Sequence, residues 1–210
     1  FATSREEEFV DKIMGLSFQE IAEKGGGILN SAKKISEISE DELFSKAYHR
    51  LTKQINLGLG AIEIKSGYGL SLEEELKMLR VIKKLKAAVD IPIKSTFLGL
   101  HAIPLAYKNN KASFVKEVVE SWLPKVLQEG LADYVDIFCE TNYFDCNDLI
   151  QLSNAIKNTP VKLKVHVNQF TTFGGVSEAV NQNALTVDHL EELNETDLLS
   201  LAKSNTIATT

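Results

Sequence analysis

The sequence predicts an α/β protein built as a TIM-barrel-like (β/α)8 fold, present as an incomplete barrel of about six strand–helix units. Short apolar runs alternate strictly with amphipathic stretches of helical spacing, which indicates a parallel sheet covered by helices. The apolar runs are continuous, as expected for strands buried on both faces. A doubly wound sheet is the alternative, but no G-x-G-x-x-G follows any strand, and histidines at strand ends favour the barrel.

The first half of the chain contains helix starts with recognisable caps. Three serines have a glutamate three residues further on, the spacing of a capping box: Ser17–Glu20, Ser39–Glu42 and Ser71–Glu74. We expect helices over 39–56 and 71–89, with a strand near 60–65 between them. The three glycines at 25–27 follow a helical stretch and predict a helix C-cap and a flexible turn.

The alternation continues to the end of the chain. Strands are expected at 91–100, 134–140, 161–167, 183–190 and 206–210, and helices at 113–130, at 146–158, after 174–175 and at 194–205. About six strands do not close a barrel of eight. The chain also begins on an apolar residue and stops inside a predicted strand. We therefore expect one partial barrel domain over 1–210, a fragment of a larger protein.

Composition restricts the classes of partner. The 210 residues are 44% hydrophobic and 25% charged with a net charge of −6, which is typical of a soluble globular protein. No basic stripe suggests nucleic acid, and no apolar run approaches the ~20 residues that span a bilayer. Neither Cys139 nor Cys146 belongs to a C-x-x-C pair, so we expect free thiols and a cytoplasmic location.

Three of the four histidines follow predicted strands directly: His101, His166 and His189. In a parallel barrel the carboxyl ends of all strands open into one pocket, so these imidazoles are expected to converge. Imidazole is a common metal ligand and an acid–base group near neutral pH. The alternative for each is a polar residue satisfied at a strand end. His49, in the middle of a predicted helix, is expected to be structural or exposed.

Several stretches resemble the imidazolonepropionases of the amidohydrolase superfamily: FATSREEEF, EKGGGILNSAKK, EIKSGYGLSLEEELKMLRV, STFLGLHAIPLAY, YVDIFCET, LKVHVNQFTTFGG and ALTVDHLE. The resemblance implies a metal-dependent hydrolase on a distorted TIM barrel. The reaction is opening of 4-imidazolone-5-propanoate by water to give N-formimidoyl-L-glutamate, in histidine degradation. The family acts on this small molecule, and a cytoplasmic homodimer is implied for the full-length protein.

The resemblance also assigns site residues. The family's zinc or iron is held by a His-x-His pair after the first strand, a histidine after the fifth and an aspartate after the eighth. Of these ligands only His166 is present, because the first-strand and eighth-strand elements are absent. By the same resemblance Arg5 and Tyr68 bind substrate, His101 contacts the substrate's ring or carbonyl, and His189 lies near the attacking water.

One departure from the family lies directly after His166. Where the family commonly has H-A-D-E, this chain has His166-Val167-Asn168-Gln169. An amide does not ionise but still donates and accepts hydrogen bonds. Either His189 handles the proton, or Gln169 orients substrate, or this copy is impaired.

Two acidic residues and the competing functions remain open. Asp188 is either a strand-end cap or a group that orients a neighbouring imidazole. Glu140 is expected to face the pocket, pairing with a histidine or holding Lys65, without a catalytic role. The alternatives to the imidazolonepropionase function are a related cyclic amidohydrolase or deaminase, and an inactive chain that lacks the full metal site.

Overall fold

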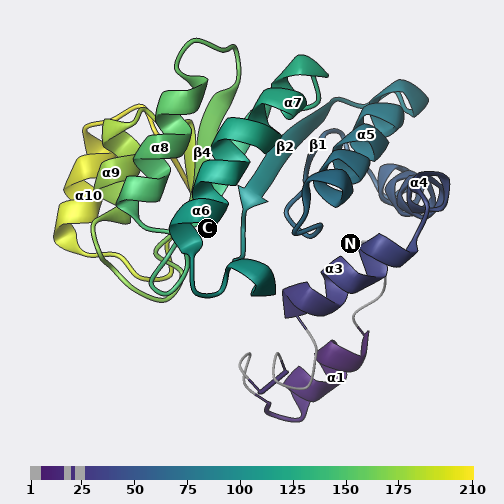
Figure 1. The fold of residues 1–210 in the computed structure, drawn as a ribbon, viewed down its shortest axis with the longest axis horizontal. Coiled ribbons are helices and arrows are strands. Elements are labelled where there is room, and N and C mark those ends of the chain that lie inside the picture. Colours follow the sequence, from purple (N-terminus) through teal and green to yellow (C-terminus); the bar gives the residue numbers. More distant parts are fainter. Residues whose placement is uncertain (1–5, 17–19, 22–26) are drawn as a thin grey trace. The chain divides into compact units, whose positions relative to one another are not determined.

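The computed structural model describes residues 6–16, 20–21 and 27–210 (Figure 1). The chain divides into two compact units, residues 1–93 and 94–210. Arg5 and Ser17, singled out in the sequence, lie outside the described residues. No helix in the described part of the chain is both long and apolar enough to cross a membrane.

In the described part of the chain, the first unit contains four helices and one short strand. Its elements are α1 (Glu6–Ile13), α3 (Gly27–Glu37), α4 (Glu40–Asn56), β1 (Ile62–Lys65) and α5 (Leu72–Ala88). The predicted helices over 39–56 and 71–89 and the strand near 60–65 are confirmed. Helix α3 was not expected, and Gly27, interpreted as part of a turn after a helix, begins it. Glycine has the lowest helix propensity after proline, so nothing in the sequence around Gly27 predicts that a helix starts there.

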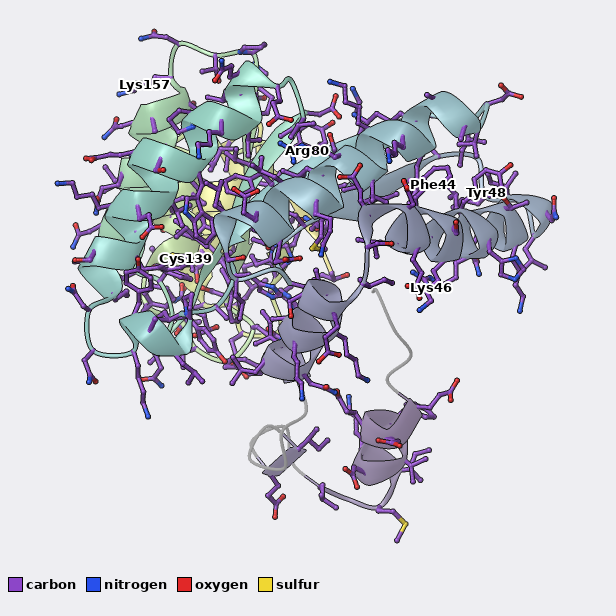
Figure 2. The ribbon with its side chains drawn as sticks, turned by 45° about the vertical axis from the view of Figure 1, so that its right-hand side comes forward. Phe44, Lys46, Tyr48, Arg80, Cys139 and Lys157 are labelled. Atoms are coloured by element: carbon purple, nitrogen blue, oxygen red, sulfur yellow. The ribbon has the colours of Figure 1, made fainter. Side chains whose placement is uncertain are left out.

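Helix α4 shows how the apolar pattern selects the buried face. The Ser39 hydroxyl caps it by accepting the backbone N–H of Glu42 at 3.2 Å. Leu43 and Leu51 are buried. Phe44 and Tyr48 stack one turn apart with ring centroids separated by 5.8 Å (Figure 2).

His49 also lies on α4 and is exposed, as expected. Its imidazole is therefore available as a solvent-facing reference for the histidines at strand ends.

The second unit contains a parallel sheet whose strands pair in the order of the sequence. The strands are β2 (Ile93–Leu100), β3 (Tyr134–Cys139), β4 (Lys162–Val167), β5 (Thr186–His189) and β6 (Ile207–Thr209). A doubly wound sheet reverses its strand order at a switch point, whereas this order continues in one direction. The predicted fold class, an incomplete (β/α) barrel, is therefore confirmed.

Helices connect consecutive strands, as right-handed parallel crossovers require. They are η1 (Leu105–Tyr107), α6 (Lys111–Glu117), η2 (Val118–Trp122), α7 (Leu123–Gln128), α8 (Cys146–Ile156), α9 (Gly175–Asn181) and α10 (Glu195–Ala202). Figure 1 shows α8, α9 and α10 side by side, and α8 packs on β3 and β4.

The helix expected over 113–130 is interrupted by a π-helical turn. This turn, η2, joins α6 to α7 and ends directly before the first turn of α7, which contains Pro124. Proline has no N–H to donate, and its ring clashes with the carbonyl four residues earlier. Widening the helix ahead of the proline avoids that clash while the segment continues in the same direction.

Candidate active site

One face of the sheet in the second unit carries a group of polar and aromatic side chains. Pairing places Phe138 of β3, His166 of β4 and Asp188 of β5 in one row across the strands. Asp136 and Lys164 form the row beneath. Side chains alternate along a strand, so these residues share a face.

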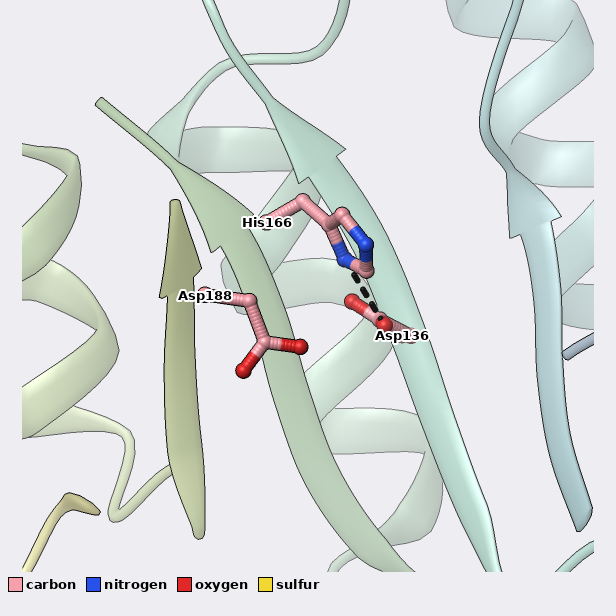
Figure 3. Close-up of side chains that lie close together, drawn as sticks. All are labelled: Asp136, His166 and Asp188. Carbon is pink, nitrogen blue, oxygen red and sulfur yellow. Dashed lines mark ion pairs between the residues drawn. The ribbon is translucent and has the colours of Figure 1, made fainter. Parts of the chain in front are cut away.

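The opposite face of the same strands is apolar. Val135, Ile137, Val165 and Val187 are fully buried there. Figure 3 shows the helices behind the sheet and the side chains of His166, Asp136 and Asp188 in front of it. One face of these strands therefore packs against the helices in the core, and the other face carries the polar side chains.

His166 lies against a buried carboxylate. Its Nδ1 is 2.8 Å from Oδ2 of Asp136, whose side chain is fully buried (Figure 3). The other oxygen, Oδ1, accepts the backbone N–H of Ile137 at 2.8 Å. This contact between Nδ1 and the buried carboxylate of Asp136 restricts the orientation of the imidazole.

His189 reaches this face through an unusual backbone conformation. It pairs in register with Val167, so regular alternation would turn its side chain toward the helices. Its φ is +89° and that of Leu190 is +65°, conformations that side-chain-bearing residues rarely adopt. The imidazole instead lies with its centroid 5.2 Å from that of His166. Backbone strain of this kind is concentrated at functional sites.

The third strand-end histidine, His101, joins the group through Phe138. Its ring meets that of Phe138 edge-on at 6.2 Å, and Phe138 lies 6.5 Å from the ring of His189. The predicted convergence of the three imidazoles is therefore confirmed in the geometry. Phe138 and Asp136 were not among the predicted site residues. Side chains two residues apart on a strand share a face, so the expected inward position of Glu140 in YVDIFCE also indicates Phe138 and Asp136.

The loop after β4, which carries Gln169, is held from two sides. Asn168 is fully buried with φ +56°, and its Nδ2 donates to Oδ2 of Asp197 at 2.9 Å and to the carbonyl of Glu192 at 2.8 Å. Gln169 follows it and is half-buried. These bonds join the loop after β4 to the loop after β5 and to the start of α10.

Glu140 holds the same loop from the other side. Its carboxylate accepts the backbone N–H of Phe170 at 2.9 Å, that of Thr141 at 2.7 Å, and the Thr171 hydroxyl. Burial opposes ionisation, but these hydrogen bonds prevail and lower the pKa of Glu140. Glu140 therefore anchors this loop through its carboxylate. Lys65, in the first unit, forms an ion pair with Glu63 at 3.1 Å.

The buried Lys164 pairs with the carboxylate of Asp188, which lies beside His166. Nζ of the buried Lys164 lies 3.7 Å from Oδ2 of Asp188 and 5.7 Å from the ring centroid of Tyr134. Oδ1 of Asp188 receives the Thr209 hydroxyl at 2.5 Å. The carboxylate of Asp188 is therefore engaged by Lys164 and Thr209.

These residues fit a metal ion in their ligand chemistry. Donor atoms of Asp136, His166 and Asp188 lie within 4.8 Å of one another. Imidazole and carboxylate are ligand types that zinc and iron use in catalytic sites. His166 offers an imidazole nitrogen, whereas Lys164 already neutralises part of the charge of Asp188.

Two further predicted residues lie elsewhere in the chain. Tyr68 is half-buried in the loop between β1 and α5 of the first unit. Arg5 is outside the described residues, so its predicted contact with substrate has no structural description. Cys139 and Cys146 are free thiols, as expected.

Comparison with known proteins identifies relatives over nearly the whole chain. No family model matches. Imidazolonepropionases of Christiangramia forsetii and Flavobacterium johnsoniae are 52% and 51% identical over 207 residues, which is 99% of this chain and 50% of each relative. The imidazolonepropionase of Shewanella sediminis is 42% identical over 209 residues, 100% of this chain and 51% of the relative.

A search of solved structures gives more distant matches. The apo structure of the N6-methyl-AMP deaminase from Arabidopsis thaliana has a TM-score of 0.48 and 14% identity, covering 87% of this chain and 61% of that one. The chain spans about half the length of the curated relatives it matches. Over that half, the chain is a homologue of the imidazolonepropionases.

Proposed function

We propose that this chain is the central part of an imidazolonepropionase, which hydrolyses 4-imidazolone-5-propanoate to N-formimidoyl-L-glutamate in histidine degradation. The observation that carries the proposal is identity of 52% to a curated imidazolonepropionase over 99% of the chain. The grouped imidazoles of His101, His166 and His189 support it, because opening a cyclic amide requires an activated water and a proton donor for the leaving nitrogen.

His166 is the proposed metal ligand within this chain. A bound zinc or iron ion would polarise the carbonyl and lower the pKa of a coordinated water. Asp136 lies 2.8 Å from the ring of His166 and orients it, as carboxylates commonly do for metal-binding histidines. In the proposed full-length enzyme, the remaining metal ligands correspond to the parts of the relatives that this chain does not span.

His189 is the proposed proton carrier. Its ring lies beside that of His166, and its Nδ1 is 3.3 Å from Oε1 of Glu191. This carboxylate favours a proton on Nδ1 and leaves Nε2 to exchange protons with water or the leaving nitrogen. Gln169 binds substrate through its amide and does not transfer protons.

The other substrate contacts follow from the family. Arg5 suits the propionate because a guanidinium binds two carboxylate oxygens at once. Tyr68 binds substrate, and His101 contacts the substrate's ring or its carbonyl. The full-length enzyme is proposed to act in the cytoplasm as a homodimer. The curated relatives described above carry the name imidazolonepropionase, which favours ring opening over deamination.

The test uses the full-length protein loaded with zinc or iron. Mass spectrometry follows conversion of 4-imidazolone-5-propanoate to N-formimidoyl-L-glutamate in the wild type, in His166→Ala and in His49→Ala. The control removes an imidazole that is exposed on α4. We expect His166→Ala to lose bound metal and at least a hundredfold in kcat/KM, with His49→Ala unchanged. An inactive wild type, or a His166→Ala variant with full activity and metal, would refute the proposal.

A further inference from the structure

A glutamate in the first unit occupies a core position that its charge does not explain. Glu75 lies near the start of α5, on the same buried stripe as Leu79 and Ile82, and only 1% of its surface is exposed. An ionised carboxylate is costly to bury unless hydrogen bonds replace its water. The groups that replace that water belong to one short loop.

That loop is residues 66–70, which follow β1 and contain Tyr68. The backbone N–H of Gly67 donates to both carboxylate oxygens of Glu75, at 2.8 and 3.1 Å, and the N–H of Gly69 donates at 2.7 Å. The Ser66 hydroxyl and the backbone of Leu70 also hydrogen-bond to the carboxylate. Burial raises the pKa of Glu75, and the hydrogen bonds from this loop act against that rise by stabilising the charged form. A single side chain therefore gathers donors from four of the five loop residues.

The two glycines permit this arrangement. Gly67 has φ +100°, a conformation that favours glycine. A Cβ on Gly69 would approach backbone atoms of Glu74 and Glu75 to 2.7 Å, which is closer than real Cβ contacts. The Gly-Tyr-Gly sequence thus lets the backbone wrap closely around the carboxylate and leaves Tyr68 as the only loop side chain between two anchored points.

We propose that Glu75 is a positioning residue that holds Tyr68 in the orientation in which its ring contacts substrate. This inference rests on the proposed function, because it takes Tyr68 as a substrate contact. Glu75 itself acts through the loop and does not touch substrate. Its carboxylate holds the loop backbone in place through hydrogen bonds, so the loop is already formed before substrate binds. Substrate binding then requires no loss of conformational entropy in this loop.

The experiment compares Glu75→Gln with Glu73→Gln in the full-length enzyme. Glu73 lies in the same first helical turn and is exposed, so it undergoes the same Glu-to-Gln substitution away from the contacts between Glu75 and the loop. The amide of Glu75→Gln directs an N–H toward the loop's own donors and loses an acceptor. We expect hydrogen exchange of the 66–70 segment and KM each to rise about tenfold in Glu75→Gln, with kcat changed less. Glu73→Gln should match the wild type in all three.

A double-mutant cycle separates positioning from a general loss of stability. Where Tyr68→Ala has already removed the ring, Glu75→Gln should no longer raise KM, because there is no ring left to position. An equal rise in KM with and without Tyr68 would overturn the inference. Ser66→Ala, which removes one donor and keeps the carboxylate, should give a smaller effect of the same kind and serves if Glu75→Gln does not fold.

The two proposals fail in different ways. A wild-type enzyme that does not hydrolyse 4-imidazolone-5-propanoate would refute the proposed function and, with it, the assigned contact of Tyr68. Unchanged hydrogen exchange of the 66–70 segment in Glu75→Gln would refute the role of Glu75 alone, whatever the substrate.

Discussion

Replacement of Glu140 by alanine should release the loop that carries Gln169. The side chain is 2% exposed and accepts the backbone N–H groups of Thr141 and Phe170 and the Thr171 hydroxyl. Each hydrogen bond to a charged acceptor contributes roughly 1.5–3 kcal/mol. Phe170 is largely exposed, so water replaces part of the loss after truncation. We therefore expect the loop's free energy of opening to fall by about 2 kcal/mol.

Hydrogen exchange followed by mass spectrometry measures that opening directly. A loss of about 2 kcal/mol corresponds to an exchange rate about 30-fold faster for peptides containing Phe170 and Thr171. Peptides from α8 report on global unfolding and should exchange as before. Glu120→Ala is the control, because its side chain is 65% exposed and makes only a 3.9 Å ion pair. Unchanged exchange in Glu140→Ala would refute the anchoring role.

The effect should also depend on pH in a defined direction. Hydrogen bonding lowers the pKa of Glu140 in the folded protein below its ordinary value of 4.5. A carboxylate with a depressed folded pKa contributes stability above the unfolded pKa and loses it as the pH falls through the folded pKa. The difference in unfolding free energy between wild type and Glu140→Gln should be full at neutral pH and shrink below about pH 4.5. A difference that grew on acidification would contradict this assignment.

Three further outcomes are expected. In the full-length enzyme, His189→Ala should lower kcat about 10²–10⁴-fold, whereas Gln169→Ala should mainly raise KM, and equal losses of kcat would refute their separate roles. Asp136→Asn should weaken metal binding about 10–100-fold by competition with a chelator, and unchanged affinity would exclude an orienting role for Asp136. The 210-residue chain alone should hold no stoichiometric metal by elemental analysis, because it supplies only His166 to the proposed site and catalytic zinc sites use three protein ligands. Tightly held metal would show instead that Asp136, His166 and Asp188 suffice.

The sequence by itself determined the order of the helices and strands. It also determined which three histidines lie together at the carboxyl ends of the strands. Continuous apolar runs and helical spacing are local properties, so they predicted the strands of the second unit and the helices α4, α5 and α8. Strand-end placement was enough to group His101, His166 and His189, because parallel strands all end at one edge. The family resemblance rested on the same local stretches.

Tertiary structure decided what these local signals do not contain. His189 reaches its neighbours through a positive φ, which reverses the side that alternation assigns to it. Asp136 and Glu140 looked like ordinary polar residues, and only the packing of β3 against β4 and its loop showed what each holds. Glu75 reads as one more charge in an acidic helix start. Its burial beneath the Gly67–Gly69 backbone depends on contacts between segments, and no pattern within a single helix encodes them.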